Sequence, residues 1–463
     1  MKKRIRTRRH FLKASATGLV GAGLTVPTAA RAQNAVRDQW GTPAILGGKP
    51  VLSGKWPAPW PVYNANTAPK YLGDVLTNSK WTQLSGDYVR RFEKALAERY
   101  GARYCFTTNT GSEGLDCALN GCEIGPGDEV LVPAYTFISG INMPFNNYAL
   151  PVLVDIEEDT FQIDPKLIEQ KITGETRAIM LCHYSGSSAN MDAIMAIARR
   201  HNLRVIEDAC LTAIGEWRGR KLGTIGDAGV VSHQQSKMVP VGEGGHVMSN
   251  DEGVYQRAYG WHDYGRKVDA ATGLPAKGAV GSIGLNFKMT EFQGAIGLAN
   301  LEIWDEQMRR REAGGKYLDR VLPTIPGISV QRHYPETTRA SYYYSLMRYD
   351  RNHFNGLPVD KFVKAAQAEG IPITEDESPK RDEPFLQRTL ESRAFRAIYS
   401  KEKLEWLRQT WDCPVTQRMC RDGILRIFGH YLITDQATLD AIPEAIRKVQ
   451  HHSALLAERL GKA

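Results

Sequence analysis

Lys237 is the residue whose type and surroundings most directly suggest covalent chemistry. It follows the short apolar run Ala228–His233 and precedes the glycine-rich stretch Gly242–Gly245. A lysine beyond the end of a strand can be partly desolvated, which lowers the pKa of its ammonium and frees a nucleophilic amine. Such an amine could form a Schiff base, although a lysine taken alone is more often a solvated surface charge.

A pair of carboxylates, Glu207 and Asp208, ends another apolar run, Leu203–Asp208. A carboxylate buried at the end of a strand requires a positively charged partner. The protonated ring nitrogen of pyridoxal phosphate is one such partner, and enzymes that use this cofactor often pair it with an aspartate. A structural salt bridge or a helix cap is the alternative role for these carboxylates.

Two further segments have residue types that suit a phosphate and a flat ring. Gly111 and Ser112 precede the helical pattern LDCALNG, where backbone N–H groups and a hydroxyl could cradle a phosphate. No Gly-Lys-Ser/Thr sequence follows them, so this is not a nucleoside triphosphate loop. Phe137 follows the run Glu129–Pro133 and could stack on a heteroaromatic ring, or serve as an ordinary core aromatic.

These residues lie at the ends of apolar runs that alternate with helical patterns such as Met191–Arg200. The runs are Glu129–Pro133, Leu150–Asp155, Ala178–His183, Leu203–Asp208 and Ala228–His233. The alternation predicts an α/β fold with a large doubly wound, mostly parallel sheet and helices on both faces. Because ligands bind beyond the carboxyl ends of such strands, we expect the four segments to meet there.

The C-terminal third has a different pattern. A helical pattern runs from Met289 to Tyr317, and shorter strands (Tyr342–Tyr349, Leu425–His430) and helices (Pro358–Glu369, Thr438–Leu460) follow it. The sequence therefore predicts a large domain over 71–314 and a smaller α+β domain over 315–463. A Pro- and Gly-rich arm over 33–70 precedes them.

The first 32 residues have the three parts of an export signal. Arg8 and Arg9 lie in TRRHFLK, the small and apolar stretch Ala14–Val26 follows, and Ala30-Arg31-Ala32 supplies a cleavage pattern. The stretch is too short to span a bilayer as a helix. We expect a twin-arginine signal peptide over 1–32, export of the folded chain to the periplasm, and no integral membrane segment after its removal. A basic cytosolic tail is the alternative.

The net charge of +8 and the pI near 9.0 first suggest a nucleic-acid partner. Eight of the 59 basic residues and none of the 51 acidic residues lie in 1–32, so the rest of the chain has 51 of each. We therefore expect no nucleic-acid partner. The seven cysteines form no CxxC pair and no Cys/His cluster with zinc spacing, so we expect no metal site.

In this order of phosphate turn, aromatic residue, carboxylate and lysine, the sequence resembles the DegT/DnrJ/EryC1/StrS aminotransferases. The resemblance extends from about residue 47 to residue 446. It is carried by the segments GPGDEVLVPAYTF, HYSGSSANMDAI, VIEDAC, SKMVPVGEGGHVMSND and LNFKMTEFQGAIGLANLE. The family consists of fold-type I pyridoxal phosphate enzymes that act on keto-sugars and keto-cyclitols.

The resemblance implies roles for particular residues. Lys237 would form the Schiff base, Asp208 would pair with the pyridinium nitrogen, and Phe137 would stack on the ring. Asn286 would reach the cofactor phosphate of the neighbouring subunit, which implies a homodimer. The phosphate in the same chain would be held by Gly111, Ser112 and Ser232.

The implied reaction moves an amino group from a glutamate- or glutamine-type donor to a keto-sugar or keto-cyclitol. The alternatives are a lyase, dehydratase or epimerase reaction on a sugar, and a non-catalytic binding or sensor protein with the same fold. One departure concerns Leu211, which stands where the family usually has glutamine. Either Thr212 supplies the missing polar group or the site is less polar at this point.

Overall fold

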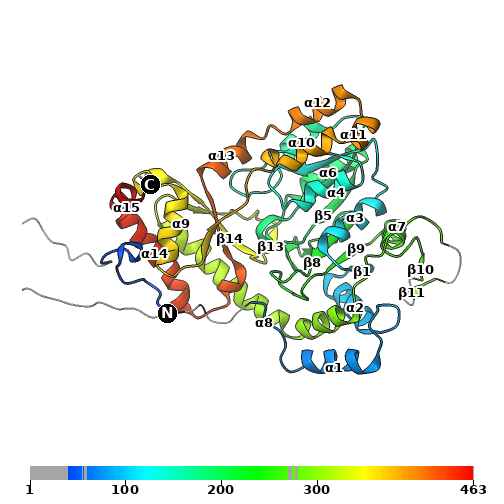
Figure 1. Cartoon of the computed structure of the whole chain (residues 1–463), viewed down its shortest axis with the longest axis horizontal. Helices are drawn as coiled ribbons and strands as arrows, with labels where there is room; N and C mark the ends of the chain where they lie inside the picture. Colours follow the sequence, from blue (N-terminus) through cyan, green and yellow to red (C-terminus); the bar gives the residue numbers. More distant parts are fainter. Residues whose placement is uncertain (1–39, 55, 57–59, 270–273, 277–279, 462–463) are drawn as a thin grey trace, which may run out of the picture. The chain divides into compact units, whose positions relative to one another are not determined.

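The larger sheet of the fold has seven strands in the order β1-β9-β8-β5-β4-β2-β3, and Figure 1 labels β1, β5, β8 and β9 of it. The structure is a computed structural model, and it describes residues 40–54, 56, 60–269, 274–276 and 280–461. The predicted signal peptide, residues 1–32, lies outside the described residues. Residues from Thr42 onward form one unit, to which the description below applies.

Six strands of this sheet are parallel, and β9 is antiparallel to both of its neighbours, β1 and β8. The strands are β1 (Tyr104–Thr108), β2 (Glu129–Pro133), β3 (Leu150–Val154), β4 (Thr176–Cys182), β5 (Arg204–Asp208), β8 (Ala228–Ser232) and β9 (Gly245–Ser249). The predicted mostly parallel sheet is confirmed, and its five predicted runs are β2 to β5 and β8.

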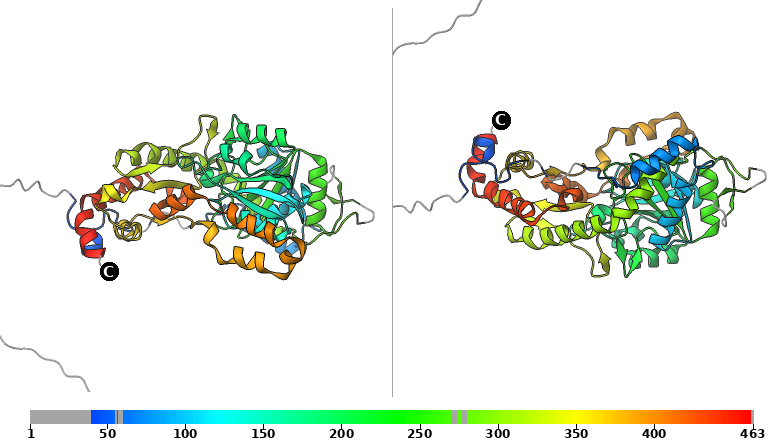
Figure 2. Two further views of the ribbon diagram at one scale, coloured as in Figure 1. Left: turned by 90° about the horizontal axis from the view of Figure 1, so that it is seen from above. Right: turned by 90° about the horizontal axis from the view of Figure 1, so that it is seen from below.

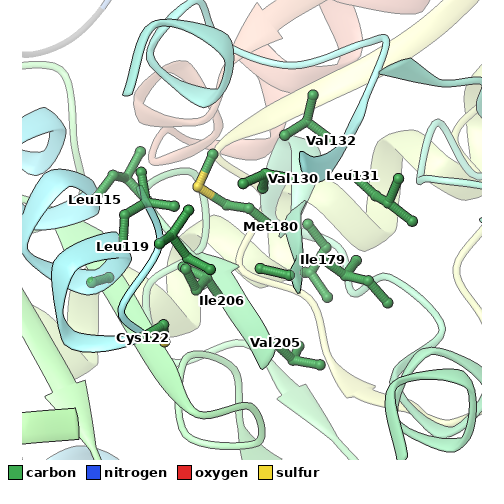
Figure 3. Close-up of a cluster of buried hydrophobic side chains, with 14 of the residues drawn as sticks. Leu115, Leu119, Cys122, Val130, Leu131, Val132, Ile179, Met180, Val205 and Ile206 are labelled. Atoms are coloured by element: carbon green, nitrogen blue, oxygen red, sulfur yellow. The ribbon is translucent and has the colours of Figure 1, made fainter. Parts of the chain in front are cut away.

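Helices cover both faces of the sheet, which explains why its strands are continuous apolar runs (Figure 2). These helices are α2 (Tyr88–Tyr100), α3 (Gly111–Gly121), α4 (Ser139–Asn146), α6 (Met191–His201) and α7 (Glu252–His262). Figure 3 shows Leu115 and Leu119 of α3 facing Met180 of β4 and Ile206 of β5, all of them fully buried. This packing holds the start of α3 at the edge of the sheet where the strands end.

The start of α2 shows how a distant residue stabilises a local element. Asp87 occupies the N-cap position, but its side chain makes no capping hydrogen bond. The carboxylate of Glu291 accepts instead from the backbone N–H groups of Tyr88, at 2.7 Å, and Val89, at 3.2 Å. Because Glu291 begins α8 (Glu291–Val321), this contact joins the two helices.

The C-terminal part has its own antiparallel sheet, in the order β12-β14-β16-β15, and its own apolar core. These strands are β12 (Ile328–Val330), β14 (Tyr344–Tyr349), β15 (Ile373–Glu375) and β16 (Ile424–Phe428). The helices against this core are α9 (Val359–Ala368), α14 (Gln436–His451) and α15 (Ser453–Leu460). The predicted helix Thr438–Leu460 is thus two helices, which meet at His452. Helix α8 runs through residue 315, and the predicted domain boundaries stay predictions.

The remaining elements are short or lie at the periphery. The helices are α1 (Ala68–Asn78), α5 (Pro165–Ile168), α10 (Pro384–Glu391), α11 (Arg393–Ile398), α12 (Lys401–Thr410) and α13 (Pro414–Asp422). The strands are β6 (Glu216–Trp217), β7 (Arg220–Lys221), β10 (Val268–Asp269), β11 (Leu274–Pro275) and β13 (Thr337–Arg339). Across the described part of the chain, no helix combines the length and the apolarity that crossing a membrane requires.

Candidate active site

A pocket of about 720 Å³ opens at the carboxyl ends of the parallel strands. Six of the seven predicted site residues line it: Gly111, Ser112, Phe137, Asp208, Ser232 and Lys237. They lie at the last residue of β5 and β8 or shortly after β1, β2 and β8, so the parallel sheet brings them together as expected.

The first turn of α3 forms one end of the pocket. Thr110 caps the helix, because its hydroxyl accepts from the backbone N–H of Glu113 at 3.1 Å. The hydroxyl of Ser112 lies 2.6 Å from that of Ser139. A Cβ atom on Gly111 would come within 2.9 Å of the Cβ of Ser232, so only glycine leaves this space open. The result is a cradle of hydroxyls and backbone amides that suits an anion.

Asp208 lies at the end of β5 and is buried. Its Oδ1 accepts from the backbone N–H of Cys210 at 3.0 Å. Burial raises the pKa of the Asp208 carboxyl, while this hydrogen bond and the charge of Lys237 oppose the rise. A cation bound against Asp208 in the pocket would therefore stabilise its charged form.

Glu207, the neighbour of Asp208, has a structural role instead. It accepts a hydrogen bond from the ring of His183, at 2.8 Å between Oε2 and Nε2, and further bonds from the backbone N–H groups of Gly223, Ile225 and Gly226. The two carboxylates that the sequence presents as a pair thus divide into one that faces the pocket and one that fixes a loop.

Lys237 extends from the turn after β8, and its side chain is half-buried. Its Nζ lies 4.4 Å from the centre of the Tyr343 ring, which is a cation–π distance. The Tyr343 hydroxyl is 2.7 Å from the Oγ of Ser236, and Ser236 Oγ donates to Gln234 Oε1 at 2.7 Å. This chain of contacts orients the lysine without neutralising it.

Phe137 and Leu211 line the pocket and affect its openness and its polarity. Phe137 is 49% exposed at the rim of the pocket, so its ring is accessible to a ligand there. Leu211 lines the pocket, whereas the Thr212 hydroxyl is buried and lies 3.1 Å from that of Ser341. Thr212 therefore does not take the place of the glutamine that the resemblance leads one to expect, and the pocket is less polar here.

The C-terminal part supplies one wall of the pocket, and none of its residues was predicted from the sequence. Arg426 of β16 lines the pocket and forms an ion pair with the buried Asp376. The other carboxylate oxygen of Asp376 accepts from the hydroxyls of Tyr135, at 2.6 Å, and Tyr184, at 2.9 Å. Other lining residues of this wall are Tyr343, Tyr344, Glu377 and Phe428. No periodic signal marks these residues, because they meet the large sheet only through the tertiary fold.

Asn286 does not line this pocket. It is exposed and forms an isolated antiparallel bridge with Asp263. Its predicted role toward the cofactor of a neighbouring subunit stays a prediction.

The residues present fit pyridoxal phosphate. The cradle at Gly111 and Ser112 suits the phosphate, and the amine of Lys237 suits the aldehyde. The buried carboxylate of Asp208 suits the protonated ring nitrogen, and the accessible ring of Phe137 suits the ring of the cofactor. Metal ligation is not needed for any of these contacts, and the described residues contain no cluster of His, Cys, Asp and Glu that could hold a metal ion.

Comparison with known proteins gives the same family. Residues 64–430 match the family model of the DegT/DnrJ/EryC1/StrS aminotransferases. The L-glutamine:scyllo-inosose aminotransferase of Streptomyces griseus is 33% identical over 416 residues, which are 88% of this chain and 97% of that protein. The L-glutamine:2-deoxy-scyllo-inosose aminotransferase of Micromonospora echinospora is 35% identical over 341 residues, 70% of this chain and 79% of that protein.

A solved structure of 3-amino-5-hydroxybenzoic acid synthase superposes with a TM-score of 0.73 at 27% identity, and covers 86% of this chain and 99% of its own. The aminotransferase from Psychrobacter cryohalolentis superposes with a TM-score of 0.73 at 26% identity, with the same coverage of 86% and 99%. The family match, the relatives and the pocket agree, and the chain belongs to the DegT/DnrJ/EryC1/StrS aminotransferase family of pyridoxal phosphate-dependent transaminases.

Proposed function

We propose that this protein transfers an amino group from L-glutamine or L-glutamate to a keto-cyclitol or keto-sugar. The observation that carries the proposal is the convergence of Lys237, Asp208 and the Gly111–Ser112 cradle in one pocket. The relatives support the class of substrate, because two of them are named for glutamine as donor and an inosose as acceptor. We take scyllo-inosose as the first acceptor to test.

The residues of the pocket divide the work of the reaction. Pyridoxal phosphate, when bound, supplies an aldehyde that takes up the amino group and a ring that withdraws electrons from the donor Cα. The Nζ of Lys237 would hold the cofactor through its aldehyde, and its free amine would take a proton from the donor Cα as a general base. The carboxylate of Asp208 holds the proton on the ring nitrogen, which keeps the ring electron-withdrawing.

Glutamine-dependent amination of scyllo-inosose, followed by mass spectrometry of the aminocyclitol, tests the proposal directly. Lys237→Ala should lower turnover by at least about a hundredfold, because it removes the general base and the covalent link. The same variant should retain no cofactor after borohydride reduction and denaturation, which identifies the attachment site independently of turnover. Product formation from the keto acceptor without any amino donor would favour the lyase, dehydratase or epimerase alternative.

The proposal includes a homodimer and export. The family resemblance supports a dimer in which Asn286, which lies outside the pocket of its own chain, serves the partner's site. The TRRHFLK segment with the apolar stretch Ala14–Val26 supports twin-arginine export to the periplasm. Replacement of both Arg8 and Arg9 by lysine should leave the protein in the cytoplasmic fraction, and unchanged periplasmic recovery would contradict the export proposal.

A further inference from the structure

Arg426 and Lys237 are the two cationic side chains among the described residues that line the pocket. In the proposed function, Lys237 holds the cofactor and serves as the general base. Arg426 lies on the opposite, C-terminal wall, and the proposed function gives it no role. A guanidinium at such a place is a candidate for recognising an anion.

The geometry leaves one side of this guanidinium uncommitted. Among the described residues, its Nη1 makes all of the polar contacts of the guanidinium, which are with Asp376, the Tyr344 hydroxyl and Glu377. Its Nε is buried and has no hydrogen-bond partner, and its Nη2 donates to no group in the part of the chain that the structure describes. The side chain is nevertheless 20% exposed, so the guanidinium reaches the pocket.

The surroundings hold Arg426 in place without neutralising its second side. The rings of Tyr344 and Phe428 lie 4.9 and 5.1 Å from the guanidinium carbon. Asp376 is fixed in turn by the hydroxyls of Tyr135 and Tyr184. Glu377, the nearest other carboxylate, lies 3.8 Å from Nη1 but 2.6 Å from the ammonium of Lys380, which balances its charge.

An amino acid donor must bring an α-carboxylate into this pocket, whereas an uncharged keto-cyclitol brings no anion. A carboxylate that leaves water requires a cation with hydrogen-bond donors, and a guanidinium can bind two carboxylates on different sides. We infer that Arg426 binds the α-carboxylate of the amino donor through its uncommitted Nη2 side, with Asp376 as the residue that positions it. This inference rests on the proposed aminotransferase function and assigns the donor its contact in that pocket.

The alternative is that Arg426 and Asp376 only tie the C-terminal part to the large sheet. Removing Arg426 alone would leave Asp376 buried and uncompensated, and the protein could then fail for that reason. The informative variant therefore removes both charges, as Asp376→Asn with Arg426→Gln. Asp376→Asn alone is the matched control, because it keeps the guanidinium and reports the effect of disturbed positioning.

The measurement is calorimetric binding of glutaramate to the cofactor-loaded protein. Glutaramate has the carboxylate and side chain of glutamine but lacks its amino group, so it binds without turnover. Pentanediamide, which lacks the carboxylate, is the control ligand. We expect the double variant to bind glutaramate about ten- to a hundredfold more weakly than Asp376→Asn does, which is the usual effect of losing a charged hydrogen bond. Cofactor binding and the acceptor KM should stay within about threefold of the Asp376→Asn values.

Equal glutaramate affinity in the two variants would overturn the inference, as would an equal rise in the KM of donor and acceptor. If the double variant does not fold, Arg426→Lys takes its place, because it keeps a charge beside Asp376 but loses the planar fork. A rise in the donor KM alone then supports the inference, and an unchanged donor KM overturns it. A wild-type protein that aminates no keto acceptor would instead contradict the proposed function.

Discussion

At the scale of single residues, the buried carboxyl groups of this protein differ by what surrounds them. Burial raises the pKa of Asp208, Asp376 and Glu93 alike. The charge of Arg426 opposes the rise in the pKa of Asp376. Asp208 faces a pocket in which a cationic ligand can bind. Glu93 of α2 has only neutral donors, the backbone and side chain of Thr107 and the side chain of Gln83. The three therefore predict different responses to pH and to ligands.

Glu93 predicts a pH dependence of stability. Burial raises its pKa to about 7 in the folded chain from an ordinary value of 4.5. Its protonated form therefore contributes stability that is complete below about pH 4.5 and is lost as the pH rises through about 7. Glu93→Gln resembles the protonated acid and keeps the accepting oxygen, so at pH 8 its free energy of unfolding should exceed that of the wild type by about 2–3 kcal/mol.

Urea denaturation at pH 5 and pH 8 measures the effect, and the two proteins should be nearly equal at pH 5. Glu93→Ala is the control. It leaves the donors of Thr107 and Gln83 without their acceptor and should be destabilised at both pH values. Parallel pH profiles for the wild type and Glu93→Gln would contradict the assignment.

Phe137 predicts an effect on cofactor affinity that does not involve folding. The residue is 49% exposed at the pocket rim, so little core packing depends on it. Phe137→Leu should weaken pyridoxal phosphate binding about tenfold, the loss expected for one aromatic stack, and should leave the melting temperature of the cofactor-free protein within about 2 °C. Tyr63→Leu is the matched control, because Tyr63 is 58% exposed and does not line the pocket. Equal cofactor affinity in both variants, by fluorescence titration, would exclude the stacking role.

At the scale of elements, the strands that could be predicted from the sequence are those whose burial gives them a recognisable apolar run. The runs that became β2 to β5 and β8 are buried on both faces, and the apolar residues at their centres make them recognisable in the sequence. Strand β9 is also buried, but its sequence, GHVMS, contains glycine and histidine and follows a glycine-rich turn. Strand β9 is as long as β2, β3, β5 and β8, so its composition and not its length hides it, and its antiparallel direction has no local signal.

The residues of the candidate site also fall into a group that could be predicted from the sequence and a group that could not. The residues at the ends of predicted strands, such as Asp208 and Lys237, could be found because the sheet topology brings strand ends together. Arg426 and Asp376 could not be found, because they lie 50 positions apart in the C-terminal part. Only the tertiary fold brings Asp376 to the hydroxyls of Tyr135 and Tyr184. Their contacts depend on how the C-terminal strands pack against the large sheet, which no local pattern specifies.

A buried ion pair after α9 predicts how the N-terminal arm is held. The carboxylate of Glu369 accepts from the backbone N–H groups of Ala44, at 2.7 Å, and Val51, at 3.1 Å, and from the ammonium of Lys448 at 2.9 Å. Lys448 also donates to the carbonyl of Lys49 at 2.7 Å. Glu369→Ala should cost about 3–5 kcal/mol in the free energy of unfolding, because it leaves the Lys448 ammonium buried without a counter-charge.

Chemical denaturation measures the loss, and limited proteolysis reports whether the arm around residues 44–52 becomes accessible. The control removes a carboxylate from an exposed ion pair. Glu306 pairs with Arg309, and both side chains are more than 60% exposed, so Glu306→Ala should change stability by at most about 0.5 kcal/mol. A loss of that small size in Glu369→Ala would contradict the role of this ion pair in holding the arm.

At the scale of the whole molecule, the net charge is unevenly distributed along the sequence. All of the excess positive charge lies in residues 1–32, and the remainder has equal numbers of basic and acidic residues. In the proposed function, this excess charge belongs to the export signal. The proposed dimer is the other property of the whole molecule, and it makes each active site depend on two chains.

Subunit complementation tests that dependence. Lys237→Ala removes the amine from its own pocket, and Asn286→Ala removes the residue that the proposal assigns to the partner's pocket. A mixed dimer of the two variants, purified through two different tags, would have one site with both defects and one site with both residues intact. Such dimers should show about half of the wild-type activity, although each parent homodimer is impaired at both sites. The assay uses a cofactor concentration that loads the wild type but not Asn286→Ala.

The expected activity of the mixed dimer is lower if Asn286 serves the pocket of its own chain. One site of the mixed dimer then lacks Lys237 and the other lacks Asn286, so neither is intact. Activity would stay at or below half of that of the Asn286→Ala homodimer, and a monomeric protein would give the mean of the two parents. Recovery above both parents is therefore the result that only a shared site produces, because no rearrangement within one chain can bring an intact Lys237 and an intact Asn286 into the same pocket.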